Sequence, residues 1–142
     1  MQKITRLILI TQRIQACLEW LPLLLARFVT GWIFLWSGWG KLHNLDDVIA
    51  FFRDLGIPAA SIQAPAIAAL EFVGGVLVLA GLGTRVFSFL LACTMAVALI
   101  TAKREDIGSL GDLFGLSEFL YLVLFVVLVV RGAGLISLDA LV

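Results

Sequence analysis

The chain has 142 residues, which is enough for one domain of ordinary size. Hydrophobic residues make up 62% of it and charged residues only 14%, whereas soluble proteins average roughly 45–50% and about 25%. Because so few charges cannot cover a water-facing surface, the composition predicts a protein that resides in the lipid bilayer. Ten basic and ten acidic residues give a net charge of zero, and their scatter argues against nucleic acid as a partner.

Residues 1–19 are expected to form an amphipathic helix that lies on the membrane surface. Their apolar residues recur at helical spacing, and Lys3, Arg6 and Arg13 lie off that face. The apolar core of this segment, "LILI", is too short for a signal peptide.

Residues 20–142 are expected to form a single membrane domain with four spans. A span takes about 20 mostly apolar residues, and four runs approach that length: about 21–42, 64–83, 86–102 and 116–131. The second and third runs are joined only by "GTR", which forces an antiparallel hairpin.

The connections between the runs complete the predicted fold. Residues 44–58, "NLDDVIAFFRDLGIP", carry one apolar face and end at Gly56 and Pro58, so we expect a short interfacial helix between the first two spans. Residues 103–115 are Gly-rich and charged and are expected to form an exposed loop. The sequence therefore predicts an all-α protein, an integral membrane antiparallel four-helix bundle.

Orientation is predicted from Lys and Arg near the ends of the spans. One side carries five of them and the other four. The side with five includes the basic N-terminus, so both termini are expected to face the cytoplasm.

Arg27 and Glu71 interrupt the first two apolar runs, and the next charge is Lys41 at the end of the first run. Each lies on a face of its helix that consists mainly of small or polar residues, so both are expected to point into the bundle. A lone charge at mid-bilayer costs about 2.5–3.5 kcal/mol, and an ion pair between Arg27 and Glu71 would remove most of that cost. Such a pair would either only fix the register of the helices or line a polar cavity that holds a ligand or relays protons.

Three further residues are candidates for function. Glu118 begins the fourth run, where it either complements the helix dipole or joins Arg27 and Glu71 as a third member of an intramembrane polar cluster. Lys41 and His43 lie at the outer boundary, where interfacial anchoring is the simpler interpretation for Lys41. A single histidine is too little for a metal site, so no metal is expected.

The two cysteines, Cys17 and Cys93, are far apart and lie in apolar surroundings. They are expected to be free, buried thiols, because the chain has no CxxC pair for thiol–disulfide chemistry.

Four stretches in this order resemble the DoxX family of small four-helix membrane proteins. They are "RFVTGWIFLWSGWGKL" (27–42), "LGIPA" (55–59), "LEFVGGVLVLAGLGTR" (70–85) and "GAGLISLDAL" (132–141). The resemblance implies a bacterial-type plasma membrane protein with both termini in the cytoplasm. It marks six polar positions: Arg27, Lys41, Glu71, Arg85, Glu118 and Asp139. The segment 1–19 is not part of the family's pattern.

The resemblance and the polar residues leave three functions open. The first is a membrane subunit of a redox-associated system that binds quinone or passes electrons to a membrane or redox protein partner. The chain holds no haem-ligand pair, CxxC or dinucleotide motif, so no intrinsic cofactor and no self-contained catalytic set are expected. The second is a non-enzymatic scaffold or assembly factor that binds a partner or a second copy of itself. The third, ranked last, is a small transporter, for which no inverted repeat is visible.

Overall fold

The computed structural model describes residues 20–134 and 137–140. Within these residues every regular element is helical, which confirms the all-α prediction. The amphipathic helix expected at residues 1–19 lies outside the described residues.

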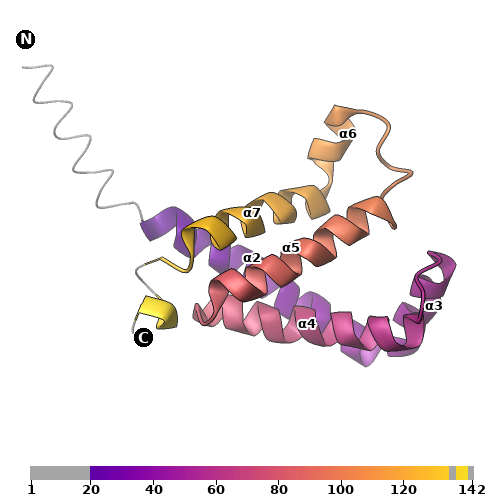
Figure 1. Cartoon of the computed structure of the whole chain (residues 1–142), viewed down its shortest axis with the longest axis horizontal. Coiled ribbons are helices and arrows are strands. Elements are labelled where there is room, and N and C mark those ends of the chain that lie inside the picture. Colours follow the sequence, from indigo (N-terminus) through magenta and orange to yellow (C-terminus); the bar gives the residue numbers. More distant parts are fainter. Residues whose placement is uncertain (1–19, 135–136, 141–142) are drawn as a thin grey trace, which may run out of the picture.

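Six α-helices and one 3₁₀ helix follow one another in the described part of the chain (Figure 1). Their bounds are α2 Trp20–His43, α3 Leu45–Asp54, α4 Ala60–Ala80, α5 Thr84–Ile100, α6 Leu110–Gly115, α7 Ser117–Arg131 and η1 Leu138–Ala140. The short helix expected between the first two apolar runs is α3, and Asp46 and Asp47 lie in its first turn, where acids favour a helix start.

Helix α4 is displaced toward the N-terminus relative to the apolar run at 64–83. It begins at Ala60 rather than residue 64, directly after Ala59, whose φ of 50° is not helical. It ends at Ala80 because Gly81 adopts a φ of 72°, and the N–H of Leu82 donates to the carbonyl of Leu77. A glycine in the left-handed conformation after the last helical residue is a common C-terminal cap, and here it leads into the tight turn before α5.

The exposed loop expected at 103–115 contains a short helix, α6, so that prediction was wrong for its second half. Ser109 begins α6 because its hydroxyl accepts a hydrogen bond from the N–H of Asp112 at 3.2 Å. A serine followed three residues later by an acid is a local helix-start signal, and it outweighed the glycines around it.

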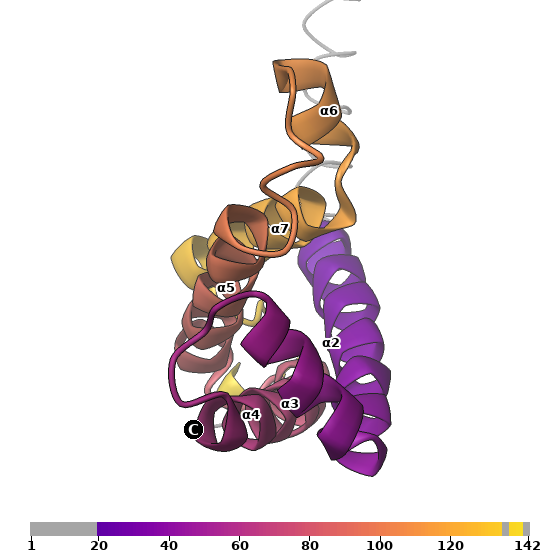
Figure 2. The ribbon, with the colours of Figure 1, turned by 90° about the vertical axis from the view of Figure 1, so that its right-hand side faces the viewer.

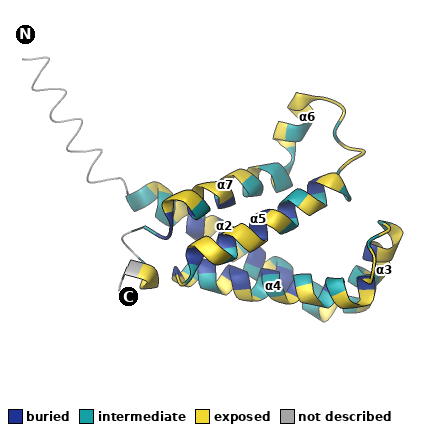
Figure 3. Ribbon diagram, viewed as in Figure 1, coloured by how far each residue is buried: buried dark blue, intermediate teal, exposed yellow. Residues whose placement is uncertain are grey.

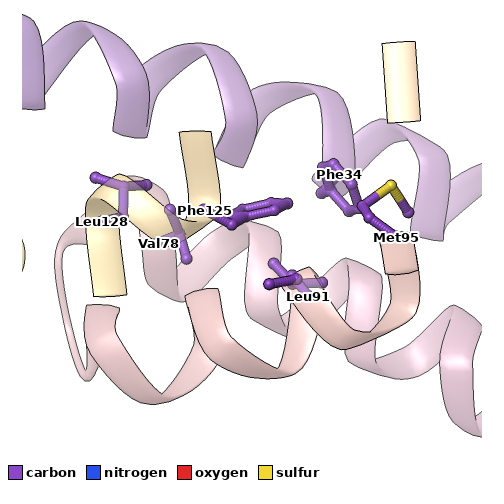
Figure 4. Packing of buried hydrophobic residues seen from close by; sticks show 7 residues of the cluster. Phe34, Val78, Leu91, Met95, Phe125 and Leu128 are labelled. Atoms are coloured by element: carbon purple, nitrogen blue, oxygen red, sulfur yellow. The ribbon is translucent and has the colours of Figure 1, made fainter. Parts of the chain in front are cut away.

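The four longest helices share one hydrophobic core. Helix α2 packs mainly on α4 and α5 packs mainly on α7, while the core includes residues from all four (Figure 4). At its centre the rings of Phe34 and Phe125 meet edge to face with centroids 4.9 Å apart. Buried residues lie where these helices face one another, and exposed ones lie on the outer faces (Figure 3).

Helices α2 and α4 approach each other backbone to backbone. A Cβ atom on Gly38 would overlap the backbone of Phe72, and one on Gly75 would overlap the backbone of Leu35. Only glycine permits this approach, which confirms that the small-residue faces of the two helices point toward each other.

Two helices in the described part of the chain, α2 and α4, are long and apolar enough to cross a membrane, while α5 is apolar but has only 17 residues. Exposed aromatic residues such as Phe28 and Trp39 cover the outer side of α2, as expected. Cys93 is free, as expected, but it is exposed on α5 and not buried, because it lies off the face of α5 that carries Leu91, Ala92 and Met95 into the core. Cys17 lies outside the described residues.

Candidate functional site

Arg27 is buried, with 3% of its surface exposed, and it lies against the C-terminal end of α4. Its Nε donates to the carbonyl of Val78 at 3.1 Å, and its two terminal nitrogens donate to the carbonyls of Leu79 and Ala133 at 2.9 and 2.8 Å. The last carbonyls of a helix lack helical partners and carry the negative end of its dipole, so they suit a guanidinium with five donors.

The expected ion pair between Arg27 and Glu71 is therefore not the one that the structure contains. Val78 and Leu79 lie seven and eight residues beyond Glu71, which is about 10–12 Å farther along the helix axis. Both residues are buried and face inward, as predicted, but they lie at different heights.

Glu71 instead forms an ion pair with Lys41. The Nζ atom of Lys41 lies 2.5 Å from Oε1 of Glu71, and the hydroxyl of Ser37 donates to Oε2 at 2.8 Å. The Glu71 side chain is 2% exposed, whereas that of Lys41 is 32% exposed, so the ammonium group is the accessible end of the pair. Lys41 was expected at the membrane boundary, although its position on the same helix face as Arg27 and Ser37 already indicated an inward direction.

A cavity of about 310 Å³ opens beside this ion pair, between α3, α4 and α5. Figure 2 views this end of the molecule, where α3 lies against α4. The walls are mostly apolar, and Lys41, Asp47 and Glu71 supply charge to the lining. The remaining wall residues that matter here are Val48 and Phe52 from α3 with Leu55 directly after it, Ile67 from α4, and Met95 and Ala98 from α5 with Thr101 directly after it.

The cavity exists because α3 folds back over the ends of its neighbours. Its apolar face packs Phe52 against Ala60 and Ala64 of α4, and the chain then turns at Gly56, whose φ is 72°. This helix was predicted from the sequence as a short interfacial helix with one apolar face, but the wall that it contributes to a cavity was missed.

The other candidate residues lie outside this cavity. His43 is exposed, and its ring packs on Trp39 with centroids 4.2 Å apart while Nδ1 lies 2.9 Å from the carbonyl of Trp39. Glu118 lies in the first turn of α7, where it accepts a hydrogen bond from the hydroxyl of Ser117 at 3.1 Å. The structure thus brings Glu71 and Lys41 together and places Arg27, His43 and Glu118 elsewhere.

At the opposite end of the molecule Asp139 joins the chain's C-terminal segment to the turn between α4 and α5 (Figure 1). Its carboxylate accepts hydrogen bonds from the N–H groups of Gly83 and Thr84 at 2.7 and 3.0 Å, and its own N–H donates to the carbonyl of Gly81 at 2.8 Å. We call Arg27, Asp139 and the turn Gly81–Thr84 the clasp. The clasp contains Arg27 and Asp139, which are two of the six polar positions that the family resemblance marks.

The pKa of Asp139 lies below its ordinary value. Burial opposes ionisation of the carboxyl group, but the hydrogen bonds from Thr84 and Gly83 and the positive charge of Arg27 together outweigh burial. The ionised form is therefore the one that the clasp stabilises.

In the part of the chain that the structure describes, no three His, Cys, Asp or Glu side chains gather closely enough to hold a metal ion. The polar groups that line the cavity are the Lys41 ammonium, the carboxylates of Asp47 and Glu71, the amide of Gln63 and the hydroxyls of Thr94 and Thr101, set among apolar walls.

Comparison with known proteins adds a family and two relatives. A family model described as DoxX matches residues 22–104. The chain is 39% identical over 121 residues to the Bacillus subtilis (strain 168) protein named "Putative oxidoreductase CatD", and the match covers 84% of this chain and 85% of that protein. It is 25% identical over 124 residues to the Escherichia coli (strain K12) protein named "Inner membrane protein YqjF", and this match covers 87% of this chain and 94% of that protein. No solved structure matches the chain.

Proposed function

The chain belongs to the DoxX family of membrane proteins, and from this premise we propose that it is a membrane subunit of a redox system that binds a quinone in the cavity between α3, α4 and α5. The observation that carries the proposal is the Lys41–Glu71 ion pair in the wall of this otherwise mostly apolar cavity. The relative's name, "Putative oxidoreductase CatD", supports the redox part.

The cavity fits an apolar ring with a few polar atoms. Its volume of about 310 Å³ lies at the lower end of the range, roughly 300–1,000 Å³, that is usual for small-molecule sites. Such sites combine apolar walls with a small number of placed polar groups, which is the combination found here. The cavity would hold a quinone head group, and a long isoprenoid tail would extend into the lipid.

Lys41 and Glu71 are the residues that would bind and orient the head group. An ammonium group has three donors, and Lys41 uses one on Glu71, so two remain for an acceptor such as a quinone carbonyl oxygen. Glu71 holds the Lys41 ammonium at the wall of the cavity, and the Ser37 hydroxyl in turn donates a hydrogen bond to the Glu71 carboxylate. A bound quinone supplies two-electron, two-proton chemistry, with the electrons drawn from a redox protein partner.

We further propose that the protein spans a bacterial plasma membrane as an antiparallel four-helix bundle with both termini in the cytoplasm. The length and apolar composition of α2 and α4 and the shared core of α2, α4, α5 and α7 support this arrangement. The name of the relative YqjF, an inner membrane protein, supports the location.

A non-enzymatic scaffold or assembly factor is the second candidate. Leu110 and Phe114 are 72% and 56% exposed, and they belong to α6, a short helix that lies beyond the end of α5 (Figure 1). Exposed apolar side chains on such a projection favour contact with a partner or with lipid.

The proposal is tested by purifying the protein from native membranes in mild detergent and measuring quinones and co-purifying proteins by mass spectrometry. Quinone is expected in extracts of the natural protein. Lys41→Met should lower its amount by about tenfold, which corresponds to the loss of one charge-assisted hydrogen bond. Ala98→Trp should lower it as well, because the indole fills the cavity and leaves the ion pair intact.

Glu118→Gln is the matched control, since this carboxylate lies outside the cavity, and it should retain the quinone. Size-exclusion profiles check that each variant remains folded. Extracts without quinone, together with no shift of the thermal midpoint on adding a soluble quinone, would refute the quinone site. A protein partner recovered equally from all variants under those conditions would favour the scaffold.

A further inference from the structure

A second cavity lies at the clasp end of the molecule, opposite the end that holds the cavity with Lys41 and Glu71. Its volume is about 490 Å³, and it is a groove between the start of α5 and the segment that follows α7. Arg85 and Arg131 line it, together with the backbone of residues 132–134 and Asp139. Neither the quinone proposal nor the clasp uses the two arginines.

Both arginines are exposed, and neither forms an ion pair with another residue that the structure describes. The ion pairs among the described residues are Lys41–Glu71 and Lys103–Asp106, so neither Arg85 nor Arg131 has an acid partner there. Arg85 lies over Gly132, where a Cβ atom would come within 3.1 Å of its Nε. The glycine therefore leaves the room that lets this side chain lie along the groove.

Asp139 does not neutralise the groove, although it lines it. Both of its carboxylate oxygens accept hydrogen bonds from the N–H groups of Gly83 and Thr84, and its charge also interacts with that of Arg27. Among the described residues, the groove therefore holds two guanidinium groups without an acid partner and one carboxylate whose oxygens both accept hydrogen bonds.

We propose that Arg85 and Arg131 bind a phosphate group, and that the phosphate is that of an anionic phospholipid head group. Guanidinium groups bind phosphate oxygens in a bidentate manner and are only weakly hydrated, so two of them beside one groove suit this anion. The groove lies at the ends of the apolar helices α4, α5 and α7, which is where lipid head groups meet a membrane protein.

The site is tested by native mass spectrometry of the purified full chain titrated with phosphatidylglycerol or with phosphatidylcholine. The natural protein should bind phosphatidylglycerol more tightly. Arg85→Gln and Arg131→Gln should each weaken that binding roughly fivefold, the equivalent of about 1 kcal/mol per basic residue. The double variant should bind both lipids about equally.

Arg104→Gln is the matched control, because it removes the same charge from an exposed position that does not line the groove, and it should leave the preference within twofold. Arg85→Lys with Arg131→Lys retains charge and should retain part of the preference, which separates loss of the site from misfolding. Equal affinity of the natural protein for the two lipids, or an equal loss in Arg104→Gln, would overturn the proposal. Displacement of the lipid by millimolar inorganic phosphate or glycerol phosphate would also overturn it, because the site would then take a free anion.

Discussion

At the scale of single residues, the inward charges are satisfied in two different ways. Arg27 and Asp139 each meet the end of a helix with the favourable sign: the cation meets the carbonyls that end α4, and the anion meets the N–H groups that begin α5. Glu71 lies in the middle of α4, away from any helix end, so it needs the opposite charge of Lys41 and a hydroxyl donor. These two solutions explain how a chain this apolar accommodates its buried charges.

The clasp predicts that stability depends on pH through Asp139. The pKa of this carboxyl is lower in the folded state than its ordinary value, so the unfolded chain binds more protons as the pH falls. Its stabilisation is complete above about pH 5 and is lost as the pH falls through the folded-state pKa. Asp139→Asn should therefore lower the thermal midpoint of the detergent-solubilised protein at pH 7, by the equivalent of about 1 kcal/mol for a lost helix cap.

The difference in midpoint between Asp139→Asn and the natural protein should shrink as the pH falls toward 3. Asp54→Asn, an exposed acid at the end of α3, is the control and should match the natural protein throughout. A constant difference across this range would show that the carboxylate's charge is not what stabilises the clasp. The other charged groups near Asp139 are the guanidinium groups of Arg27, Arg85 and Arg131.

At the scale of elements, the contact between α2 and α4 is decided by glycine. Their backbones meet at Gly38 and Gly75, where no other residue leaves room. This close approach sets how far one helix is displaced along the other, and it thereby places Lys41 opposite Glu71 and Arg27 opposite the end of α4.

Gly38→Ala should destabilise this contact, because the added methyl group would overlap the backbone of Phe72 and lie 2.8 Å from the carbonyl oxygen of Ala68. Overpacking of this kind costs about 1–3 kcal/mol, which thermal unfolding in detergent would show as a lower midpoint. Gly40→Ala is the matched control in the same helix, because a methyl group there meets nothing within 4 Å. Equal midpoints for the two variants would mean that the helices do not pack this closely.

At the scale of the whole molecule, the two ends differ in chemistry. One end has the clasp and the groove with Arg85 and Arg131, and the other has the apolar cavity beneath α3. In the proposed membrane orientation the first end faces the cytoplasm, and the loop that follows α5 faces the outside.

Cysteine labelling tests this orientation. In a background with Cys17→Ser and Cys93→Ser, Glu105→Cys should react with a membrane-impermeant maleimide in intact cells, since residue 105 is exposed beyond α5. Leu138→Cys, exposed in η1, should react only after the cells are permeabilised. Reaction of Leu138→Cys in intact cells would place the clasp outside and reverse the proposed orientation.

The sequence by itself determined the all-α fold and the inward faces of α2 and α4. Both depend on local information, because apolar composition predicts helices in lipid and the period of 3.6 residues decides which side chains share a face. For that reason Arg27, Phe34 and Glu71 could each be placed inside before any neighbour was known. The start of α6 at Ser109 was readable by the same local rule and was missed.

The pairing of Glu71 with Lys41, and of Arg27 with the end of α4, could be known only from the tertiary structure. Sharing a face says nothing about height along a neighbouring helix, and that height depends on where Gly38 and Gly75 allow the backbones to meet. The cavity likewise needs α3 to fold over α4 and α5, segments that are distant in the chain. The physical reason is that helical periodicity is a property of neighbours in sequence, whereas ion pairs and cavities depend on contacts between helices.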